Sequence, residues 1–190
     1  MNGEIITVSA DLNNAQTLKN KLEVFRQIRT FIFDVDGVMT DGRLQVTDAG
    51  DFLRTFHTRD GYAIRRAIEE GYNVCVMTGG KGNSIEKRLK ILGIRHYYLG
   101  ADNKLPIFNS YVAAHNINLF DTIYMGDDLN DYEVIQKVGL ACCPSDACPE
   151  IMSLSHYISP FKGGDGCVRD VIEKVMKLQG TWMRHLTVSG

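Results

Sequence analysis

The chain has 190 residues, of which 44% are hydrophobic and 23% are charged, and its formal net charge is -2. This length and composition predict one soluble globular domain with a full hydrophobic core. The slightly acidic balance argues against nucleic acid as a partner, and no apolar run reaches the roughly 20 residues of a membrane span. The first twenty residues lack the pattern of a signal peptide, so we expect a cytoplasmic protein.

Short apolar runs alternate with longer amphipathic segments along most of the chain. The runs are rich in Ile, Val, Phe and Tyr and predict strands at 30–33, 72–78, 94–100, 121–128 and 140–144. The segments between them have apolar residues at helical spacing and predict helices at 62–71, 83–93, 104–116 and 130–139. This alternation predicts an α/β fold, a Rossmann-like three-layer sandwich with a mostly parallel sheet, in which ligands bind at the carboxyl ends of the strands.

One segment breaks the alternation just after the first strand. Residues 41–57 contain two short strand patterns around the turn signal Asp48-Ala49-Gly50, which predicts an inserted β-hairpin. We expect a single domain at 28–182 that contains this hairpin, an N-terminal extension at 1–27 and a C-terminal tail at 183–190.

The first strand leads directly into two acidic residues. Asp34 follows the apolar run "TFIF" and Asp36 lies two positions further on, so both carboxylates can face the same side of the strand end. Two interpretations stay open at this point. The acids either form a solvated turn, or they need a cation or a division of protonation states to coexist.

Two later strand ends favour the second interpretation. Thr78 and Gly79 offer a hydroxyl and backbone N–H groups that can hold a phosphate, although a Thr-Gly turn is also a common helix cap. The strand at 121–128 ends in a group of acids, Asp127, Asp128 and Asp131. Because the carboxyl ends of parallel strands share one edge of the sheet, these oxygens predict a Mg²⁺ site beside a phosphate. Lys104, otherwise a surface lysine, would supply a cation there.

The order of these motifs, DxDG, a strand ending in Thr-Gly, a lysine and then GDDxND, resembles the haloacid dehalogenase superfamily of phosphohydrolases. The stretches "FDVDGVMTDG", "TRDGYAIR", "GDDLND" and "GGDGCVRDVIE", with a hairpin in place of a cap domain, are similar to the family of 3-deoxy-D-manno-octulosonate 8-phosphate phosphatases. That family is a capless branch of the superfamily. The resemblance covers about residues 28–182 and implies hydrolysis of a phosphorylated sugar acid in lipopolysaccharide precursor synthesis.

The resemblance also implies roles for the acids. Asp34 would be the nucleophile that forms an aspartyl-phosphate, and Asp36 would protonate the leaving sugar oxygen and then activate water. Mg²⁺ would be held by the Asp34 carboxylate, the Asp36 backbone carbonyl and Asp127. Asp128 or Asp131 would support these ligands from behind.

The same resemblance assigns the cationic and polar groups. Thr78 and the Gly79 N–H would bind the phosphoryl oxygens, while Lys104 would offset the charge between nucleophile and phosphate. Residues that match those contacting the sugar acid, or lying beside it, are His57, Thr58, Arg59, Asp60, Gly61, Arg65 and Arg88. The family closes its open site by forming a homotetramer, with hairpins packed centrally and a neighbour's tail over the site, so we expect a homotetramer here.

Two positions depart from the family pattern. Many members carry Arg directly after the Thr-Gly pair, whereas this chain has Gly80 followed by Lys81, which could replace the charge. The C-terminal segment that usually reads GGRG contains Asp165 here. These departures leave open a phosphatase of a nine-carbon sialic-acid-type 9-phosphate. A non-catalytic oligomerisation module of the same fold is a second alternative.

Overall fold

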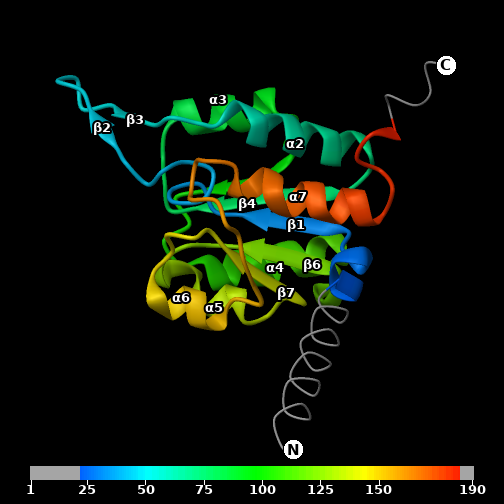
Figure 1. Cartoon of the computed structure of the whole chain (residues 1–190). Helices are drawn as coiled ribbons and strands as arrows, with labels where there is room; N and C mark the ends of the chain where they lie inside the picture. Colours follow the sequence, from blue (N-terminus) through cyan, green and yellow to red (C-terminus); the bar gives the residue numbers. More distant parts are fainter. Residues whose placement is uncertain (1–21, 185–190) are drawn as a thin grey trace, which may run out of the picture.

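The computed structural model describes residues 22–184 of the chain (Figure 1). Most of the expected N-terminal extension and of the expected C-terminal tail therefore lies outside the described residues. At the start of the described range, residues 22–27 are helical, and Phe25 is buried in the core. Gln179 donates hydrogen bonds from its Nε2 to the carbonyl oxygens of Phe25 and Ile28, which ties this helix to the C-terminal part of the domain.

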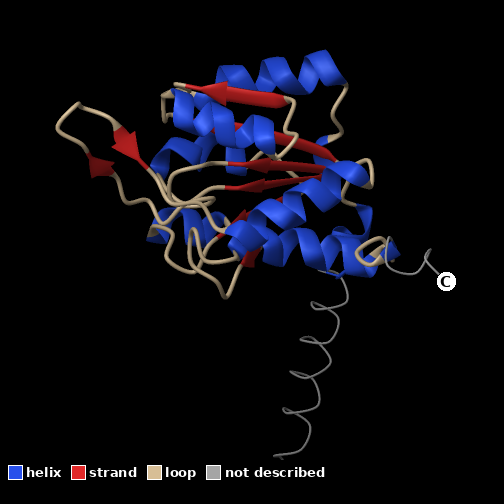
Figure 2. Cartoon of the chain, turned by 90° about the horizontal axis from the view of Figure 1, so that it is seen from above, coloured by secondary structure: helices blue, strands red, loops and turns tan. Residues whose placement is uncertain are grey.

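A six-stranded parallel sheet in the order β5-β4-β1-β6-β7-β8 forms the middle layer (Figures 1 and 2). Strand β1 lies between β4 and β6, and all four of its residues are buried. A strand covered on both faces needs a continuous apolar run, as "TFIF" provides. The six strands are β1 (Thr30–Phe33), β4 (Asn73–Thr78), β5 (His96–Leu99), β6 (Thr122–Met125), β7 (Leu140–Cys143) and β8 (Tyr157–Ile158).

Helices cover both faces of the sheet, as Figure 1 shows, so the predicted three-layer α/β sandwich is confirmed. One hydrophobic cluster packs beneath α2 (Thr58–Glu69), α3 (Asn83–Ile91) and α7 (Cys167–Leu178). The other packs beneath α4 (Lys104–His115), α5 (Tyr132–Ile135) and α6 (Pro149–Leu154). Two 3-10 turns, η1 (Leu119–Asp121) and η2 (Leu129–Asp131), flank β6. No helix in residues 22–184 is long and apolar enough to cross a membrane.

The predicted hairpin is present and projects from the body of the domain (Figures 1 and 2). It consists of β2 (Gln45–Val46) and β3 (Phe52–Leu53), which pair in antiparallel register. Four large apolar side chains of the hairpin are exposed, namely Leu44, Val46, Phe52 and Leu53. A two-stranded ribbon is marginally stable alone in water, so these side chains make the hairpin a surface suited to packing against another molecule.

Candidate active site

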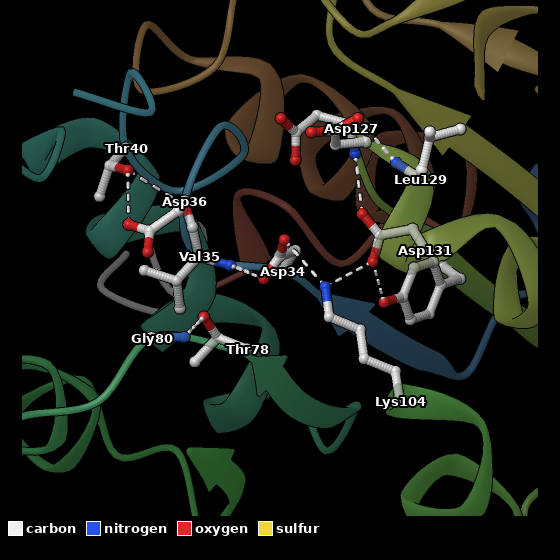
Figure 3. Close-up of polar contacts among 12 residues, drawn as sticks. Asp34, Val35, Asp36, Thr40, Thr78, Gly80, Lys104, Asp127, Leu129 and Asp131 are labelled. Carbon is white, nitrogen blue, oxygen red and sulfur yellow. Dashed lines mark hydrogen bonds and ion pairs between the residues drawn. The ribbon is translucent and has the colours of Figure 1, made fainter. Parts of the chain in front are cut away.

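Three adjacent strands deliver the candidate site to one edge of the sheet. Phe33, at the end of β1, pairs with Val76 of β4 and Met125 of β6, so the residues after these positions lie side by side. They border a cavity of about 310 Å³ (Figure 3). The cavity is lined by Asp34, Asp36, Gly42, Thr78, Gly79, Gly80, Asp127, Asp128 and Asn130.

Asp34 is held from two sides. Its Oδ1 accepts a hydrogen bond from the backbone N–H of Val35 at 2.6 Å, and its Oδ2 lies 2.9 Å from the Nζ of Lys104. Asp34 is only 2% exposed. This arrangement fixes the carboxylate at the wall of the cavity, as a nucleophile in an in-line displacement requires.

Lys104 comes from the first turn of α4 and reaches the cavity edge as a buried cation (Figure 3). Its Nζ contacts Asp131 Oδ1 at 2.6 Å as well as Asp34. Burial lowers the pKa of Lys104, but the two carboxylates outweigh burial and raise it, so the ammonium stays charged. The family resemblance assigned Lys104 to the site, and the structure adds that its side chain is fully enclosed.

Asp131 connects the acids to the interior of the domain. Its Oδ1 also accepts from the hydroxyl of Tyr124 at 2.5 Å, and its Oδ2 accepts from the backbone N–H of Asp127 at 3.0 Å. Its oxygens are thus already engaged, which suits a residue that orients its neighbours. Asp128 is exposed and caps η2 by accepting from the N–H of Leu129. Of the two candidates for the supporting acid, Asp131 is therefore the one that contacts Lys104 and the backbone of Asp127.

The carboxylates create a strongly negative pocket. Burial, followed by the charge of Asp131, raises the pKa of Asp34 to about 7, although Lys104 opposes the shift. Burial, followed by the charges of Asp34 and Asp131, raises the pKa of Asp127 to about 8. The buried Oδ1 of Asp127 has no hydrogen-bond partner among the described residues. A divalent cation would satisfy this oxygen and offset the repulsion.

The acids are close enough to share such a cation. Asp34, Asp127 and Asp131 each have a ligand oxygen within 4.8 Å of the others. Hard carboxylate oxygens in small number suit Mg²⁺, which retains several waters. Because Asp131 is already bound by Lys104, Tyr124 and Asp127, the carboxylates best placed to hold the ion are Asp34 and Asp127.

The raised pKa values give a prediction for the metal-free protein. Asp34 and Asp127 bind protons more tightly when folded than in the unfolded chain, where the reference pKa is 3.8. Their contribution to stability is therefore full below about pH 4 and is lost as pH rises through 7 to 8. We expect the melting temperature of the metal-free protein to fall over this window, and Mg²⁺ to reverse the fall. A slope unchanged in Asp127→Asn would contradict this assignment.

Two glycines leave room for the acids. Gly37 has φ +88°, and a Cβ there would lie 1.9 Å from Asp127 Oδ2. A Cβ on Gly126 would lie 2.3 Å from Asp131 Oδ2. The glycine of "DVDG" thus allows the loop after β1 to approach Asp127 of the loop after β6, and the glycine of "MGDD" leaves room for Asp131 within its own loop.

Asp36 lines the same cavity but faces a different partner. Arg54, just after β3, donates to both carboxylate oxygens of Asp36, from Nε at 2.6 Å and from Nη2 at 2.9 Å. Thr40 donates a longer hydrogen bond of 3.4 Å to the same carboxylate (Figure 3). Arg54, Thr40 and Tyr124 were not predicted as site residues from the sequence.

The Thr-Gly segment ends β4 beside these acids. Thr78 is buried, and its Oγ1 accepts from the backbone N–H of Gly80 at 3.0 Å, which fixes the turn. Thr78 and Gly79 therefore border the cavity together. Lys81 does not line this cavity: its side chain is 71% exposed and lies 3.7 Å from Asp102.

The residues predicted to contact the sugar acid lie outside the 310 Å³ cavity. His57 and Arg59 line a second cavity of about 520 Å³ together with Asp165 and Arg169. Arg88 lies over the Phe56 ring and against Gly61, where a Cβ would meet its Nη2 at 2.6 Å. The first residue of α2, Thr58, and Arg65 on the same helix are both exposed. Among residues 22–184, none of this set lines the cavity that the acids border.

Asp60 has a structural partner. It is buried, and its Oδ1 accepts from the backbone N–H of Arg169 at 2.8 Å, in the first turn of α7. The N-cap residue of α7, Gly166, has no side chain to do this. Asp60 of α2 therefore caps the neighbouring helix across the interface between the two elements.

We expect Asp60→Ala to lower the free energy of unfolding by about 1–2 kcal/mol, the usual value of a cap. Asp60→Asn keeps an acceptor oxygen at the same place and should retain most of the stability. Urea denaturation of both variants measures the difference. Equal losses in the two variants would show that the charge, and not the cap, is what matters.

Comparison with known proteins identifies the family. The model of haloacid dehalogenase-like hydrolases matches residues 101–171, which contain Lys104 and the acids of the β6 loop. The 3-deoxy-D-manno-octulosonate 8-phosphate phosphatase KdsC of Escherichia coli K12 is 39% identical over 153 residues, which cover 80% of this chain and 81% of the relative. The chain belongs to the 3-deoxy-D-manno-octulosonate 8-phosphate phosphatase family of haloacid dehalogenase-like hydrolases.

Solved structures of the family agree with the fold. The 3-deoxy-D-manno-octulosonate 8-phosphate phosphatase of Yersinia pestis superposes with a TM-score of 0.83 at 36% identity, covering 86% of this chain and 88% of that one. The phosphatase of Moraxella catarrhalis, solved with a magnesium ion, a phosphate ion and KDO, superposes with a TM-score of 0.84 at 28% identity. That match covers 89% of this chain and 97% of the other.

Proposed function

We propose that this protein is a Mg²⁺-dependent phosphomonoesterase that hydrolyses 3-deoxy-D-manno-octulosonate 8-phosphate to the free sugar acid and phosphate. The observation that carries the proposal is the buried acidic pocket: Asp34 is fixed by Lys104, and Asp127 beside it has an unpaired buried oxygen. Membership of a family whose relatives carry this substrate in their names supports it.

The first chemical step uses Asp34 and Asp36. The Asp34 carboxylate attacks phosphorus in line, so a bond forms from its oxygen to phosphorus while the bond from phosphorus to the sugar oxygen breaks. Asp36 gives its proton to the departing sugar oxygen. Thr78 and the Gly79 N–H hold the phosphoryl oxygens, and the ammonium of Lys104 favours the ionised form of Asp34 and holds it in place.

The second step regenerates the enzyme. Asp36 takes a proton from water, which attacks phosphorus and releases phosphate from Asp34. The residues that would hold Mg²⁺ are Asp34 and Asp127 through their carboxylates and Asp36 through its backbone carbonyl, and the ion supplies positive charge for the phosphoryl oxygens. Asp131 orients Asp127 and Lys104 through the contacts described above.

Substrate recognition involves the second cavity and the α2–α3 arginines. His57, Arg59 and Arg88 offer cations or donors for a carboxylate and hydroxyls. Thr58, Gly61, Arg65 and Lys81 are further proposed recognition residues, and Asp60 would support recognition indirectly by capping α7. We propose a cytoplasmic homotetramer of the lipopolysaccharide precursor pathway, in which exposed apolar hairpin residues pack between subunits and complete the site. Asp165 lines the second cavity together with Arg59, so we propose that it influences which sugar acid is accepted.

Phosphate release from the eight-carbon substrate, measured beside the nine-carbon sialic-acid-type 9-phosphates with and without Mg²⁺, tests this function. We expect Mg²⁺-dependent preference for the eight-carbon acid, lost in Asp34→Asn. Preference for a nine-carbon acid would keep the chemistry and change the substrate. No release from any of them would indicate a non-catalytic module of the same fold.

A further inference from the structure

The proton-transfer residue Asp36 is held by the hairpin. Arg54 donates hydrogen bonds from Nε and Nη2 to the two carboxylate oxygens of Asp36. This two-point fork is the strongest geometry of an arginine–carboxylate ion pair. The Arg54 side chain is 5% exposed, whereas that of Asp36 is 30% exposed and borders the cavity. The contact therefore orients Asp36 at the cavity wall from behind, while Arg54 itself does not line the cavity.

Arg54 is anchored by its place in the chain. It follows directly on β3, and its Nη1 also donates to the carbonyl of Phe52 at 3.4 Å. Asp36 lies in the loop after β1, with Thr40 as its second side-chain partner. Arg54 is thus the side chain that joins the base of the hairpin to the loop that carries both candidate catalytic acids.

Gly80 keeps space for this ion pair. A Cβ at Gly80 would lie 3.0 Å from Asp36 Oδ2 and 3.1 Å from Arg54 Nη2, closer than side chains usually approach. Gly80 is not among the glycines with positive φ, so alanine would not strain its backbone, but the neighbouring side chains, which include Ile85 Cδ1 at 3.0 Å, would have to shift.

We propose that Arg54 is a positioning residue that holds Asp36 for proton transfer to the leaving oxygen, and that Gly80 provides the space this pair requires. The inference rests on the proposed function, which assigns proton transfer to Asp36. Its physical basis is orientation: a group that exchanges protons must lie within hydrogen-bond reach of the oxygen it serves, and a carboxylate held at two points has one orientation. The fork binds the ionised carboxylate, which is the form of Asp36 after it has given its proton to the leaving oxygen and before it takes the next proton from water.

The consequence is a dependence on the leaving group. A sugar alkoxide leaves only if it is protonated, whereas the stabilised phenolate of p-nitrophenyl phosphate leaves without a proton. The constant kcat/KM covers the steps up to the departure of this group and excludes the later hydrolysis. We expect Arg54→Ala to lower kcat/KM for the sugar acid phosphate by about 10²-fold, within the usual contribution of a general acid. For p-nitrophenyl phosphate we expect a change of less than about threefold.

Matched variants separate positioning from loss of structure. Arg43→Ala removes an exposed arginine from the same hairpin region and should leave both constants unchanged. Arg54→Lys keeps the charge but not the fork, so it should restore part of the loss. Melting temperatures and Mg²⁺ binding by calorimetry should remain at wild-type values in all three. A loss in Arg54→Ala that is equal for the two substrates would overturn the inference.

Gly80→Ala provides an independent test from the other side of the pair. It should reproduce the selective loss for the sugar acid phosphate, and combining it with Arg54→Ala should add little, because both changes disrupt the same contact. Additive losses would contradict the inference. Asp36→Asn separates a failure of the proposed proton transfer from a failure of the role proposed for Arg54. If it slows both substrates equally, the proposed proton transfer fails; if it is selective and Arg54→Ala is not, only the role of Arg54 fails.

Discussion

Asp34→Asn is expected to abolish phosphate release while the protein remains folded. An amide cannot attack phosphorus as a carboxylate does, and loss of a residue essential to covalent catalysis lowers kcat by on the order of 10⁴-fold or more. Stability should change by less than about 1 kcal/mol, because Lys104 keeps its contact with Asp131 and one buried like charge is removed.

Phosphate release at saturating substrate and urea denaturation measure the two quantities. Asp48→Asn, in the exposed turn of the hairpin, is the matched control and should leave both unchanged. Trapping the phosphorylated protein and locating the modified residue by mass spectrometry identifies the nucleophile directly. Phosphorylation of any residue other than Asp34, or full activity in the Asn variant, would refute the assignment.

Lys104→Met is expected to damage stability and activity together. Its ammonium lies between the carboxylates of Asp34 and Asp131, at 2.9 and 2.6 Å, and its side chain is completely buried. Removing one partner of such a group leaves buried charge uncompensated, which typically costs about 3–5 kcal/mol. Without the cation, the nucleophile also loses its fixed position, so kcat should fall by about 10²-fold or more.

Lys81→Met is the matched control for Lys104→Met. Lys81 is 71% exposed and lies 3.7 Å from Asp102, so its loss should cost less than about 1 kcal/mol. Urea denaturation and phosphate release are measured for both variants. The comparison is between a buried lysine, Lys104, and an exposed one, Lys81. Similar losses of stability in the two variants would contradict the role assigned to burial.

The site residues that follow buried strands were predictable from the sequence. Asp34 and Asp127 come after apolar strands and Thr78 ends one, and parallel strands place such positions at one edge. The structure explains the glycines beside the acids, because a side chain at Gly37 or Gly126 would overlap a neighbouring aspartate. The central sheet was predictable for the same reason, since fully buried strands need continuous apolar runs.

Residues whose role depends on distant contacts were not predictable. Arg54 is close to Asp36 because a hairpin of two-residue strands folds back, and no periodicity encodes that return. Tyr124 looks like an ordinary member of an apolar strand, yet its hydroxyl binds Asp131. Asp60 was assigned to the sugar from its motif, while its carboxylate caps α7. The helix that contains Asp60 also begins at Thr58, earlier than the helix predicted at 62–71.

The position of β1 between β4 and β6 has a consequence for how activity appears during synthesis. Thr30 pairs with Asn73 on one side and with Thr122 on the other, so its second partner is made long after the first. A nascent chain that has released β1 and β4 carries Asp34 and the Thr-Gly turn but lacks the acids of the β6 loop. The candidate site is therefore assembled only after β6 has been made and has paired with β1.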